Sequence, residues 1–496
     1  MSAALDQIPA PHEASSLTLV EQLVQWARRR IEERVFRPGM RMPSIRKLAQ
    51  DKGVSRFTVV EAYERLVAQG YLESRRGSGF YVRERAASGP GERGTAAGQQ
   101  TRAGAAARPI DVVWLVRNTL HAGKSDKGPG LGYLPSHWLD GELVASALRA
   151  LARQSAGQWL GTGTAQGFLP LRQQLQNRLE ELEIGATPDQ IVLTSGITQA
   201  IDFIARLYVQ PGDAVIVGDP AWFQMFGRFA AQGARLVGMP YTPAGPDLDA
   251  LEEQVKTWRP KMLVINSVLH NPTGTSLSPA QAFRILRLAE EYDFVVVEDD
   301  IYGDLCPPSH PVTRLATLDQ LKRVIYLSSF SKTLTANLRV GFVACAPEVA
   351  QAIGDQKILI SMTTPELNER LLYKILTEGH YRRYVERLRA RLDPVREQTA
   401  RMLERAGFSL FSMPTAGMFL WADAGVDADA FAAAGQEAGF LLAPGSLFSP
   451  HQSPTTWMRF NVANCGDPEL PRFLADYIES RHRVARPLKA QADVPN

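Results

Sequence analysis

The chain has 496 residues, of which 45% are hydrophobic and 22% are charged. These proportions are those of an ordinary folded protein, and they exclude a chain that is disordered, collagen-like or coiled-coil as a whole. At roughly 100–200 residues per domain, the length predicts more than one domain. The net charge of +3 is too small for a protein that binds polyanions with its whole surface.

The charges are unevenly distributed along the chain. Residues 16–85 contain 15 Lys/Arg and 8 Asp/Glu, whereas residues 86–496 contain 40 Lys/Arg and 42 Asp/Glu. The sequence therefore predicts a basic N-terminal part followed by a nearly neutral larger part.

Targeting and redox signals are weak. The first residues, MSAALDQIPAPHEASS, have neither the basic start nor the apolar run of a signal peptide. No apolar run approaches the roughly 18 residues of a membrane span. Cys306, Cys345 and Cys465 are widely spaced and match no disulfide or zinc pattern. We therefore expect a cytoplasmic protein with no metal site and no membrane partner.

The basic part reads as a compact series of short elements. Apolar residues recur at helical spacing, Ser44 and Ser55 stand at cap positions, and a glycine-rich turn separates two strand-like runs. The predicted elements are, in order, helix 17–33, helix Ile45–Asp51, helix Arg56–Gln69, and a β-hairpin of strands 71–74 and 80–82. This order predicts a winged helix-turn-helix, whose second helix fits the major groove of DNA.

The residues expected to contact DNA lie at the start of the second helix, at the hairpin tip and beside them. Hydroxyl and guanidinium groups there can reach base edges or phosphates, and a glycine lets the backbone approach the phosphates closely. The candidates are Arg41, Ser44, Arg46, Ser55, Arg56, Thr58, Arg75, Arg76 and Gly77. The alternative is a basic helical domain that binds protein.

The run PGMRMPSIRKLAQDKGVSRFTVVEAYERLVAQGYLESRRGSGFYV, from Pro38 to Val82, resembles the GntR regulators. This resemblance implies a winged helix-turn-helix that works as a dimer on double-stranded DNA and is fused to a ligand-sensing domain.

Residues 85–109 predict a linker. Ala and Gly fill 13 of these 25 positions, and no large apolar residue is present. Such a stretch buries too little surface to offset its ordering entropy. We therefore predict three parts: a DNA-binding domain at 16–84, a flexible linker at 85–109, and a second domain at 110–496. The alternative is a surface loop within one domain.

Apolar strand-like runs alternate with amphipathic helices from Ile191 onward. The runs are Ile191–Thr194, Ala214–Val217, Met262–Ile265, Phe294–Val297, Val324–Leu327 and Val340–Ala344. This alternation predicts an α/β fold with a mostly parallel sheet, in which ligands bind at the carboxyl ends of the strands.

Polar motifs stand at those ends. Lys332, in SSFSK, is able to form a Schiff base with an aldehyde if its pKa is lowered. The acids of the run Glu298-Asp299-Asp300 follow a strand, and a carboxylate there suits a metal or a protonated pyridine nitrogen. Asn271 is a possible donor to a phenolate-like oxygen, and the SGITQ segment forms a helix N-terminus that suits a phosphate. Trp222 offers a flat face to a ring. Taken one by one, these residues also fit a loop lysine, turns, caps and core positions.

The segments TSGITQA, GDPAWF, HNPTG, EDDIYGD, SSFSK and NLRVGF resemble, in this order, the fold-type I pyridoxal-phosphate enzymes of the aspartate aminotransferase superfamily. The resemblance implies a large domain plus a small domain, with Lys332 as the Schiff-base lysine. It implies cofactor contacts from Asp299, Tyr302, Asn271, Ser329, Arg339, Gly196, Ile197 and Trp222. It also implies that Arg459 holds a substrate or effector carboxylate, for which a guanidinium is well shaped. Thr162, with Trp159 nearby, stands where the family has an aromatic residue that reaches a neighbouring subunit.

The pairing of the two parts resembles the MocR subfamily of transcriptional regulators. This resemblance implies a pyridoxal phosphate-binding sensor for an amine or amino acid, and a head-to-tail, domain-swapped homodimer on an operator. The alternative is an active aminotransferase that carries an auxiliary DNA-binding part. A purely structural scaffold is disfavoured by the intact lysine, acid and phosphate set.

Overall fold

The computed structural model describes residues 17–75, 77–83, 128–154, 157, 160–310 and 312–485. The chain divides into two compact units, Met1–Ala106 and Ala107–Asn496, which we call the head and the body. The predicted linker, residues 85–109, lies outside the described residues, as do Arg76 and Trp159. The boundaries 16–84 and 110–496 stay predictions.

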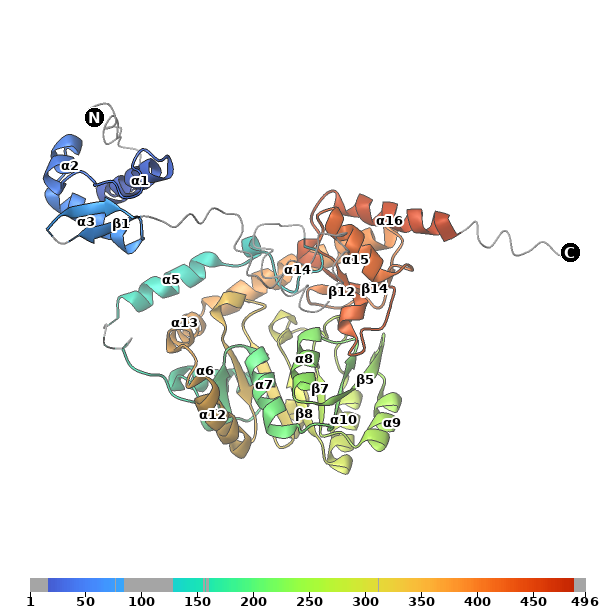
Figure 1. The fold of residues 1–496 in the computed structure, drawn as a ribbon. Helices are drawn as coiled ribbons and strands as arrows, with labels where there is room; N and C mark the ends of the chain where they lie inside the picture. The colour runs from blue at the N-terminus through green and yellow to red at the C-terminus, as the bar shows by residue number, and fades with distance from the viewer. Residues whose placement is uncertain are drawn as a thin grey trace. The chain divides into compact units, whose positions relative to one another are not determined.

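The head has the predicted order of elements (Figure 1). It consists of α1 (Leu19–Glu32), α2 (Ile45–Lys52), α3 (Arg56–Ala68), β1 (Leu72–Arg75) and β2 (Gly79–Val82). Ser44 and Ser55 cap α2 and α3 as expected, because their hydroxyls accept hydrogen bonds from the amides of Lys47 and Thr58. Gly53 ends α2 in the left-handed region at φ 65°, where a side chain would be strained. The helices and hairpin share one apolar core.

The body contains an eight-stranded sheet with the order β3-β10-β9-β8-β7-β4-β5-β6. Its strands are β3 (Ile191–Thr194), β4 (Ala214–Asp219), β5 (Arg235–Thr242), β6 (Gly245–Pro246), β7 (Met262–Ile265), β8 (Val295–Asp299), β9 (Val324–Ser329) and β10 (Gly341–Ala344). The central strands are parallel, whereas β10 runs antiparallel to both neighbours and β6 antiparallel to β5. The prediction of a mostly parallel sheet is confirmed, with β8 beginning one residue later than expected and ending at Asp299.

A smaller antiparallel sheet follows, with the order β11-β12-β14-β13. Its strands are β11 (Ser409–Leu410), β12 (Phe419–Asp423), β13 (Ala443–Pro444) and β14 (Trp457–Asn461). The body helices are α5 (Gly141–Ala152), α6 (Leu169–Glu181), α7 (Ile197–Tyr208), α8 (Phe223–Ala231), α9 (Leu248–Trp258), α10 (Pro279–Tyr292), α11 (Leu315–Asp319), α12 (Pro347–Ser361), α13 (Glu366–Thr377), α14 (His380–Arg405), α15 (Ala428–Glu437) and α16 (Leu470–Ala485).

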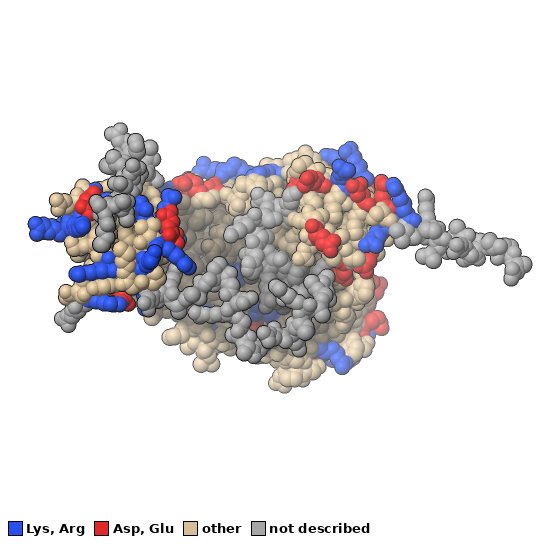
Figure 2. Space-filling view, turned by 45° about the horizontal axis from the view of Figure 1, so that its top comes forward, with Lys and Arg blue, Asp and Glu red and all other residues tan. Residues whose placement is uncertain are grey.

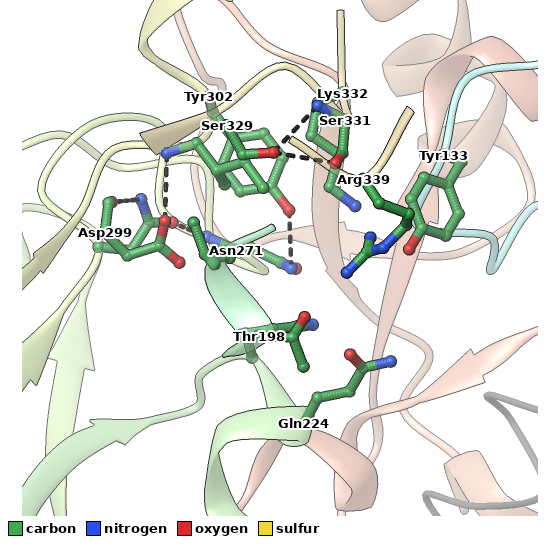
Figure 3. Close-up of a pocket in the computed structure, with 14 residues that line it drawn as sticks. Tyr133, Thr198, Gln224, Asn271, Asp299, Tyr302, Ser329, Ser331, Lys332 and Arg339 are labelled. Atoms are coloured by element: carbon green, nitrogen blue, oxygen red, sulfur yellow. Dashed lines mark hydrogen bonds between the residues drawn. The ribbon is translucent and has the colours of Figure 1, made fainter. Parts of the chain in front are cut away.

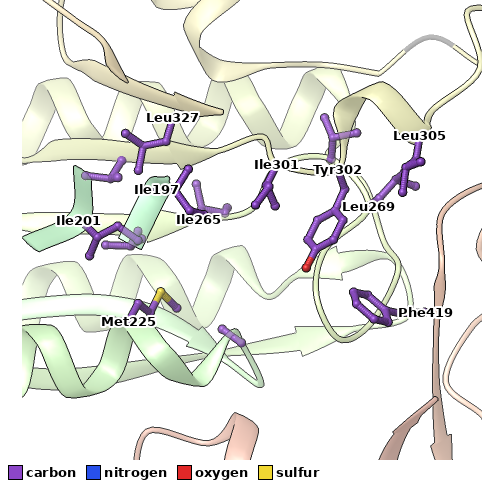
Figure 4. Close-up of a cluster of buried hydrophobic side chains, with 14 of the residues drawn as sticks. Ile197, Ile201, Met225, Ile265, Leu269, Ile301, Tyr302, Leu305, Leu327 and Phe419 are labelled. Carbon is purple, nitrogen blue, oxygen red and sulfur yellow. The ribbon is translucent and has the colours of Figure 1, made fainter. Parts of the chain in front are cut away.

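One apolar core joins the two sheets of the body and their helices. Ile265 on β7 and Leu327 on β9 belong to this core with Ile197 and Ile201 of α7, and Met225 on α8 lies nearby (Figure 4). Tyr302 meets Phe419 of the small sheet edge-on, with ring centroids 5.5 Å apart. This packing fixes the strand ends of the large sheet against the small sheet, which is where the polar motifs lie.

None of the helices among the described residues combines the length and apolar character that a membrane crossing requires.

Candidate functional site

A pocket lies at the carboxyl ends of the parallel strands (Figure 3). Its walls come from β8 and β9, from the turns that follow β7 and β9, and from the starts of α7 and α8. The lining residues are Tyr133, Ile197, Thr198, Trp222, Gln224, Asn266, Asn271, Asp299, Ile301, Tyr302, Ser329, Ser331, Lys332 and Arg339. The pocket therefore lies where the strand-end rule predicts a ligand site.

Lys332 projects into this cavity three residues beyond the end of β9. Its Nζ donates to the carbonyl of Gly132 at 2.7 Å and lies 3.9 Å from the ring centroid of Tyr133. Withdrawal of the ammonium group from water lowers the pKa of Lys332 to about 7. The charge of Arg459 lowers the pKa further, whereas Asp299 opposes the shift. A substantial neutral fraction at pH 7 makes this amine a nucleophile.

Asp299 ends β8 and is buried in the wall of the cavity. Burial raises the pKa of Asp299 to about 7, while the amide of Ile301, which donates to its Oδ1 at 3.1 Å, opposes the shift. The two neighbouring acids have other partners: Glu298 accepts from backbone amides of α11, and Asp300 pairs with Arg314 at 2.6 Å. Asp299 alone of the three acids lines the cavity.

Tyr302 and Asn271 form a connected pair opposite Asp299. The Asn271 side-chain amide donates to the Tyr302 hydroxyl at 3.1 Å, and the Asn271 backbone amide donates to Asn266 at 2.9 Å. Burial raises the pKa of Tyr302, so its hydroxyl stays protonated. The pair thus offers neutral donors to an oxygen atom of a ligand.

Arg459 lies on β14 and brings the small sheet into the site. Its guanidinium donates to Asn271 at 3.0 Å and to the Gly130 carbonyl at 2.7 Å, and it lies 4.4 Å from the Phe419 ring centroid. Its Nε is buried without a hydrogen-bond partner. Burial lowers the pKa of Arg459 to about 10, so the group is charged at pH 7. Within the part of the chain that the structure describes, no carboxylate pairs with this buried cation.

A second polar group of residues lies where α7 begins. Gly196 precedes the helix at φ 75°, and no side chain caps the first-turn amides. Arg339 donates to the Ser195 carbonyl at 2.7 Å, and a Cβ on Gly196 would stand only 2.8 Å from the Arg339 guanidinium. Helix N-terminus and guanidinium therefore converge on a space that suits an anion. The Gly196 amide itself donates to Thr194, so Ile197 is the better placed of the two predicted amides.

The structure brings most of the predicted cofactor contacts to the cavity wall. Eight of them line it, namely Lys332, Asp299, Tyr302, Asn271, Ser329, Arg339, Ile197 and Trp222. Gly196 and Arg459 adjoin it through the contacts given above. Sequence reasoning missed Tyr133, Thr198 and Gln224 as wall residues. Thr198 lies within TSGITQA and Gln224 lies two residues beyond Trp222, so both could have been inferred from the motifs, whereas no motif marks Tyr133.

These residues fit pyridoxal phosphate. The aldehyde has an amine of lowered pKa in Lys332, the ring nitrogen has a buried acid in Asp299, and the ring oxygen has Tyr302 and Asn271. The phosphate has the uncapped α7 N-terminus and Arg339. Each group of the cofactor thus meets a residue of matching charge or hydrogen-bonding capacity.

The head presents its candidate contacts on the surface. Figure 2 shows Lys and Arg side chains projecting from the head, with fewer Asp and Glu. Arg41, Arg46 and Arg56 are exposed, whereas the Ser44 and Ser55 hydroxyls cap their helices. At the hairpin tip, Gly77 turns the chain at φ 75°. Two further candidates among the described residues have internal contacts: Arg75 pairs with Glu73, and the Thr58 hydroxyl lies 2.7 Å from that of Ser55.

Two family models match the chain. Residues 136–476 match the aminotransferase class I and II model, and residues 19–82 match the model of the bacterial regulatory proteins of the gntR family. The first match covers both sheets of the body and every lining residue of the pocket except Tyr133, and the second covers the three helices and the hairpin of the head.

Relatives that are named as regulators match the chain over most of its length. The chain is 26% identical over 475 residues to the uncharacterized HTH-type transcriptional regulator YisV of Bacillus subtilis, a match that covers 92% of this chain and 95% of that relative. It is 30% identical over 383 residues to the probable rhizopine catabolism regulatory protein MocR of Rhizobium meliloti, covering 74% and 73% of the two chains.

Among solved structures, LysN, an α-aminoadipate aminotransferase from Thermus thermophilus, is similar to the body. It has a TM-score of 0.68 and 28% identity, and the match covers 75% of this chain and 95% of that one. That structure holds N-(5'-phosphopyridoxyl)-L-leucine. With a gntR-type winged helix-turn-helix and an aminotransferase class I and II body on one polypeptide, the chain belongs to the MocR-like transcriptional regulators.

Proposed function

We propose that the protein regulates transcription from an operator, and that pyridoxal phosphate and an amine or amino acid bound in the body control how the head binds DNA. Pyridoxal phosphate supplies an aldehyde that reacts reversibly with primary amines. Lys332 anchors it, Asp299 holds the ring nitrogen, and Tyr302 and Asn271 hold the ring oxygen. Arg339, Ser329 and the start of α7 hold the phosphate. Because DNA is its partner, we expect the protein in the cytoplasm.

The observation that carries this proposal is Arg459. A buried guanidinium without a carboxylate partner is costly, and an anionic ligand offsets that cost through two parallel hydrogen bonds. Since Arg459 adjoins Lys332 through the Gly130–Tyr133 segment, the favoured ligand carries an amine and a carboxylate, as an amino acid does.

The same segment offers a route from the ligand to the head. The Gly132 carbonyl accepts from Lys332 and the Gly130 carbonyl accepts from Arg459. A ligand that takes over either donor competes with this segment, which is the first described stretch after the linker. Regulation requires that the ligand bind two arrangements of the protein with different affinity, and this competition provides such a difference.

We also propose a homodimer of the head-to-tail, domain-swapped type, whose two heads bind two half-sites. Leu160, Leu359 and Met362 are 86%, 86% and 68% exposed. Residues 160–163 lie beside the α12–α13 turn, since a Cβ on Gly163 would be 3.5 Å from Thr363. Thr162 lies in the same stretch as Leu160, and burial of these exposed apolar side chains against a second copy would offset their exposure. Presenting two heads together raises their effective concentration on DNA.

The proposal is tested by footprinting the full-length protein on the DNA upstream of its own gene, with and without pyridoxal phosphate and a panel of amines and amino acids. The expected result is a protected site whose occupancy changes with the cofactor and with one class of amine. Absence of any protected site, or protection that is indifferent to every added compound, contradicts the proposal.

An active aminotransferase with an auxiliary head is the second candidate, favoured by the complete set of cofactor-contacting residues and by the likeness to LysN. It predicts steady turnover of an amino acid with an oxo-acid acceptor. It also predicts that Lys332→Ala abolishes turnover while leaving every promoter unaffected. Regulation predicts instead that Lys332→Ala changes promoter occupancy, and that the unmodified protein carries out at most one slow half-reaction per site.

A further inference from the structure

Phe57 is exposed at the start of α3, in the first turn of the predicted recognition helix. Its side chain is 76% exposed. The other aromatic residues described in the head are buried or half-buried, namely Trp26, Phe36, Tyr63, Tyr71, Phe80 and Tyr81. Exposing a phenyl ring forfeits the free energy of its burial, so a position that keeps one on the surface calls for a partner.

Its neighbours narrow the choice of partner. Ser55 accepts from the Thr58 amide at 3.0 Å, and the two hydroxyls lie 2.7 Å apart, so both are engaged in the helix cap. Arg56 and Phe57 are the exposed side chains between them. The first turn of α3 contains no acid, and the helix dipole makes this end positive. The surroundings therefore suit a polyanion.

The rest of the helix limits how α3 meets that polyanion. Val59, Ala62, Tyr63 and Leu66 are buried in the head, which leaves the opposite face outward. On that face Glu61, four residues after Phe57, pairs with Arg65 at 2.7 Å, and Glu64 is exposed. These acids repel phosphates, so α3 enters a groove by its first turn and not along its length.

We infer that Phe57 reads DNA by packing against the 5-methyl group of a thymine in the major groove of each half-site. In that groove thymine is the base that presents a methyl group, and phenylalanine is among the side chains that contact it. Arg56 beside it supplies the hydrogen bonds that phenylalanine lacks. This inference rests on the proposed DNA-binding function and adds the base that α3 selects.

The test uses the full-length protein and the duplex that it protects upstream of its own gene. Each thymine in a half-site is replaced in turn by deoxyuridine, which removes the methyl group and nothing else. For the unmodified protein, replacement of one particular thymine in each half-site should weaken binding by about fourfold. This is the factor that corresponds to burying one methyl-sized apolar group. Phe57→Ala should bind the thymine duplex more weakly by a similar factor or more. Its affinity should not change further when that thymine is replaced by deoxyuridine.

Two further variants serve as controls. Leu19→Ala truncates another exposed apolar side chain, 47% exposed at the start of α1, and should leave binding and deoxyuridine sensitivity unchanged. Phe57→Leu keeps an apolar group and should retain part of the sensitivity. Alanine favours helix more than phenylalanine does, so α3 remains folded in Phe57→Ala, which far-ultraviolet circular dichroism checks.

The outcomes separate this inference from the proposed function. If the protein protects a duplex but no deoxyuridine weakens binding, or if the same substitution weakens Phe57→Ala equally, the thymine contact is refuted while DNA binding stands. A loss of affinity in Phe57→Ala that is independent of every methyl group assigns Phe57 to a protein contact and also refutes it. Failure of the protein to bind any duplex overturns both.

Discussion

The head and the body place their functional residues in opposite ways. In the head, the candidate contacts lie within one short stretch, from Arg41 to Gly77, and the candidate arginines that the structure describes are exposed. In the body, residues as distant as Tyr133 and Lys332 line one cavity, and Arg459 beside it donates to Asn271 and to the Gly130 carbonyl. Exposed charges act almost independently and are screened by salt, whereas buried groups that share partners act as a unit. Substitutions should therefore be graded in the head and severe in the body.

The severest case is Lys332→Ala. Among the described residues no other amine lines the cavity, so the covalent attachment of pyridoxal phosphate should be lost entirely. The unmodified protein should be yellow, with absorbance at roughly 410–430 nm from the amine-bound aldehyde. The measurement is mass spectrometry after borohydride reduction of protein incubated with the cofactor.

Lys374→Ala is the matched control, because Lys374 lies on α13 and pairs with Glu378 at 2.9 Å, away from the cavity. It should keep both colour and adduct. If Lys332→Ala formed an adduct of undiminished yield at another lysine, the assignment of Lys332 would be refuted. The expectation of severe effects in the body would then fail as well.

Arg459→Lys tests whether the buried site acts through paired hydrogen bonds. Lysine keeps the charge but not the planar fork that grips a carboxylate. The affinity for an amino acid should fall about tenfold to a hundredfold, which is the range for charged hydrogen bonds. The affinity for the corresponding amine without a carboxylate should not change. Titration of the cofactor absorbance measures both, and an equal loss for the two ligands would show that Arg459 supports the fold and not the carboxylate.

The same contrast explains what the sequence could predict. The order of elements in the head and the edges of the large sheet follow from local patterns, because caps such as Ser44 and apolar runs act over a few residues. The motif residues Lys332, Asp299 and Asn271 also meet where the strand-end rule places them. In the triplet Glu298-Asp299-Asp300, however, composition did not distinguish the acid that lines the cavity from those paired with α11 and Arg314. That choice depends on tertiary contacts.

Tyr133 illustrates the same limit. Its ring meets Lys332 because Asn461 and Asn464, more than three hundred residues away, bind the Tyr133 carbonyl at 2.9 Å. No local pattern encodes such a contact. Similarly, the exposure of Phe57 follows from which face of α3 packs on the head, and not from its place in the motif.

Arg56→Ala tests the graded side of the comparison. If Arg56 binds a guanine, its removal should weaken operator binding by about 1–3 kcal/mol. If Arg56 binds a phosphate, its removal should reduce by about 1 the slope of the logarithm of the binding constant against the logarithm of the salt concentration. Arg29→Ala is the control, because Arg29 is 81% exposed and pairs with Glu33 on α1, outside the recognition helix. Fluorescence anisotropy over a range of salt concentrations distinguishes the cases. Complete loss of binding in Arg56→Ala would show that the DNA contacts of the head act as a unit, as the residues of the body do, and would contradict the graded expectation.

The pH dependence of cofactor capture sharpens the account of Lys332. Because burial lowers its pKa to about 7, its neutral fraction increases with pH up to about 7 and is then constant. A free lysine derivative, with a pKa near 10.4, continues to gain neutral amine up to that value. The capture rate of Lys332 divided by that of the free lysine derivative cancels the titration of the cofactor itself. It should stay constant below pH 7 and fall about tenfold per pH unit above it. A ratio that is flat from pH 6 to 9 would mean that the cavity does not lower the pKa of Lys332, and that its reactivity comes from position alone.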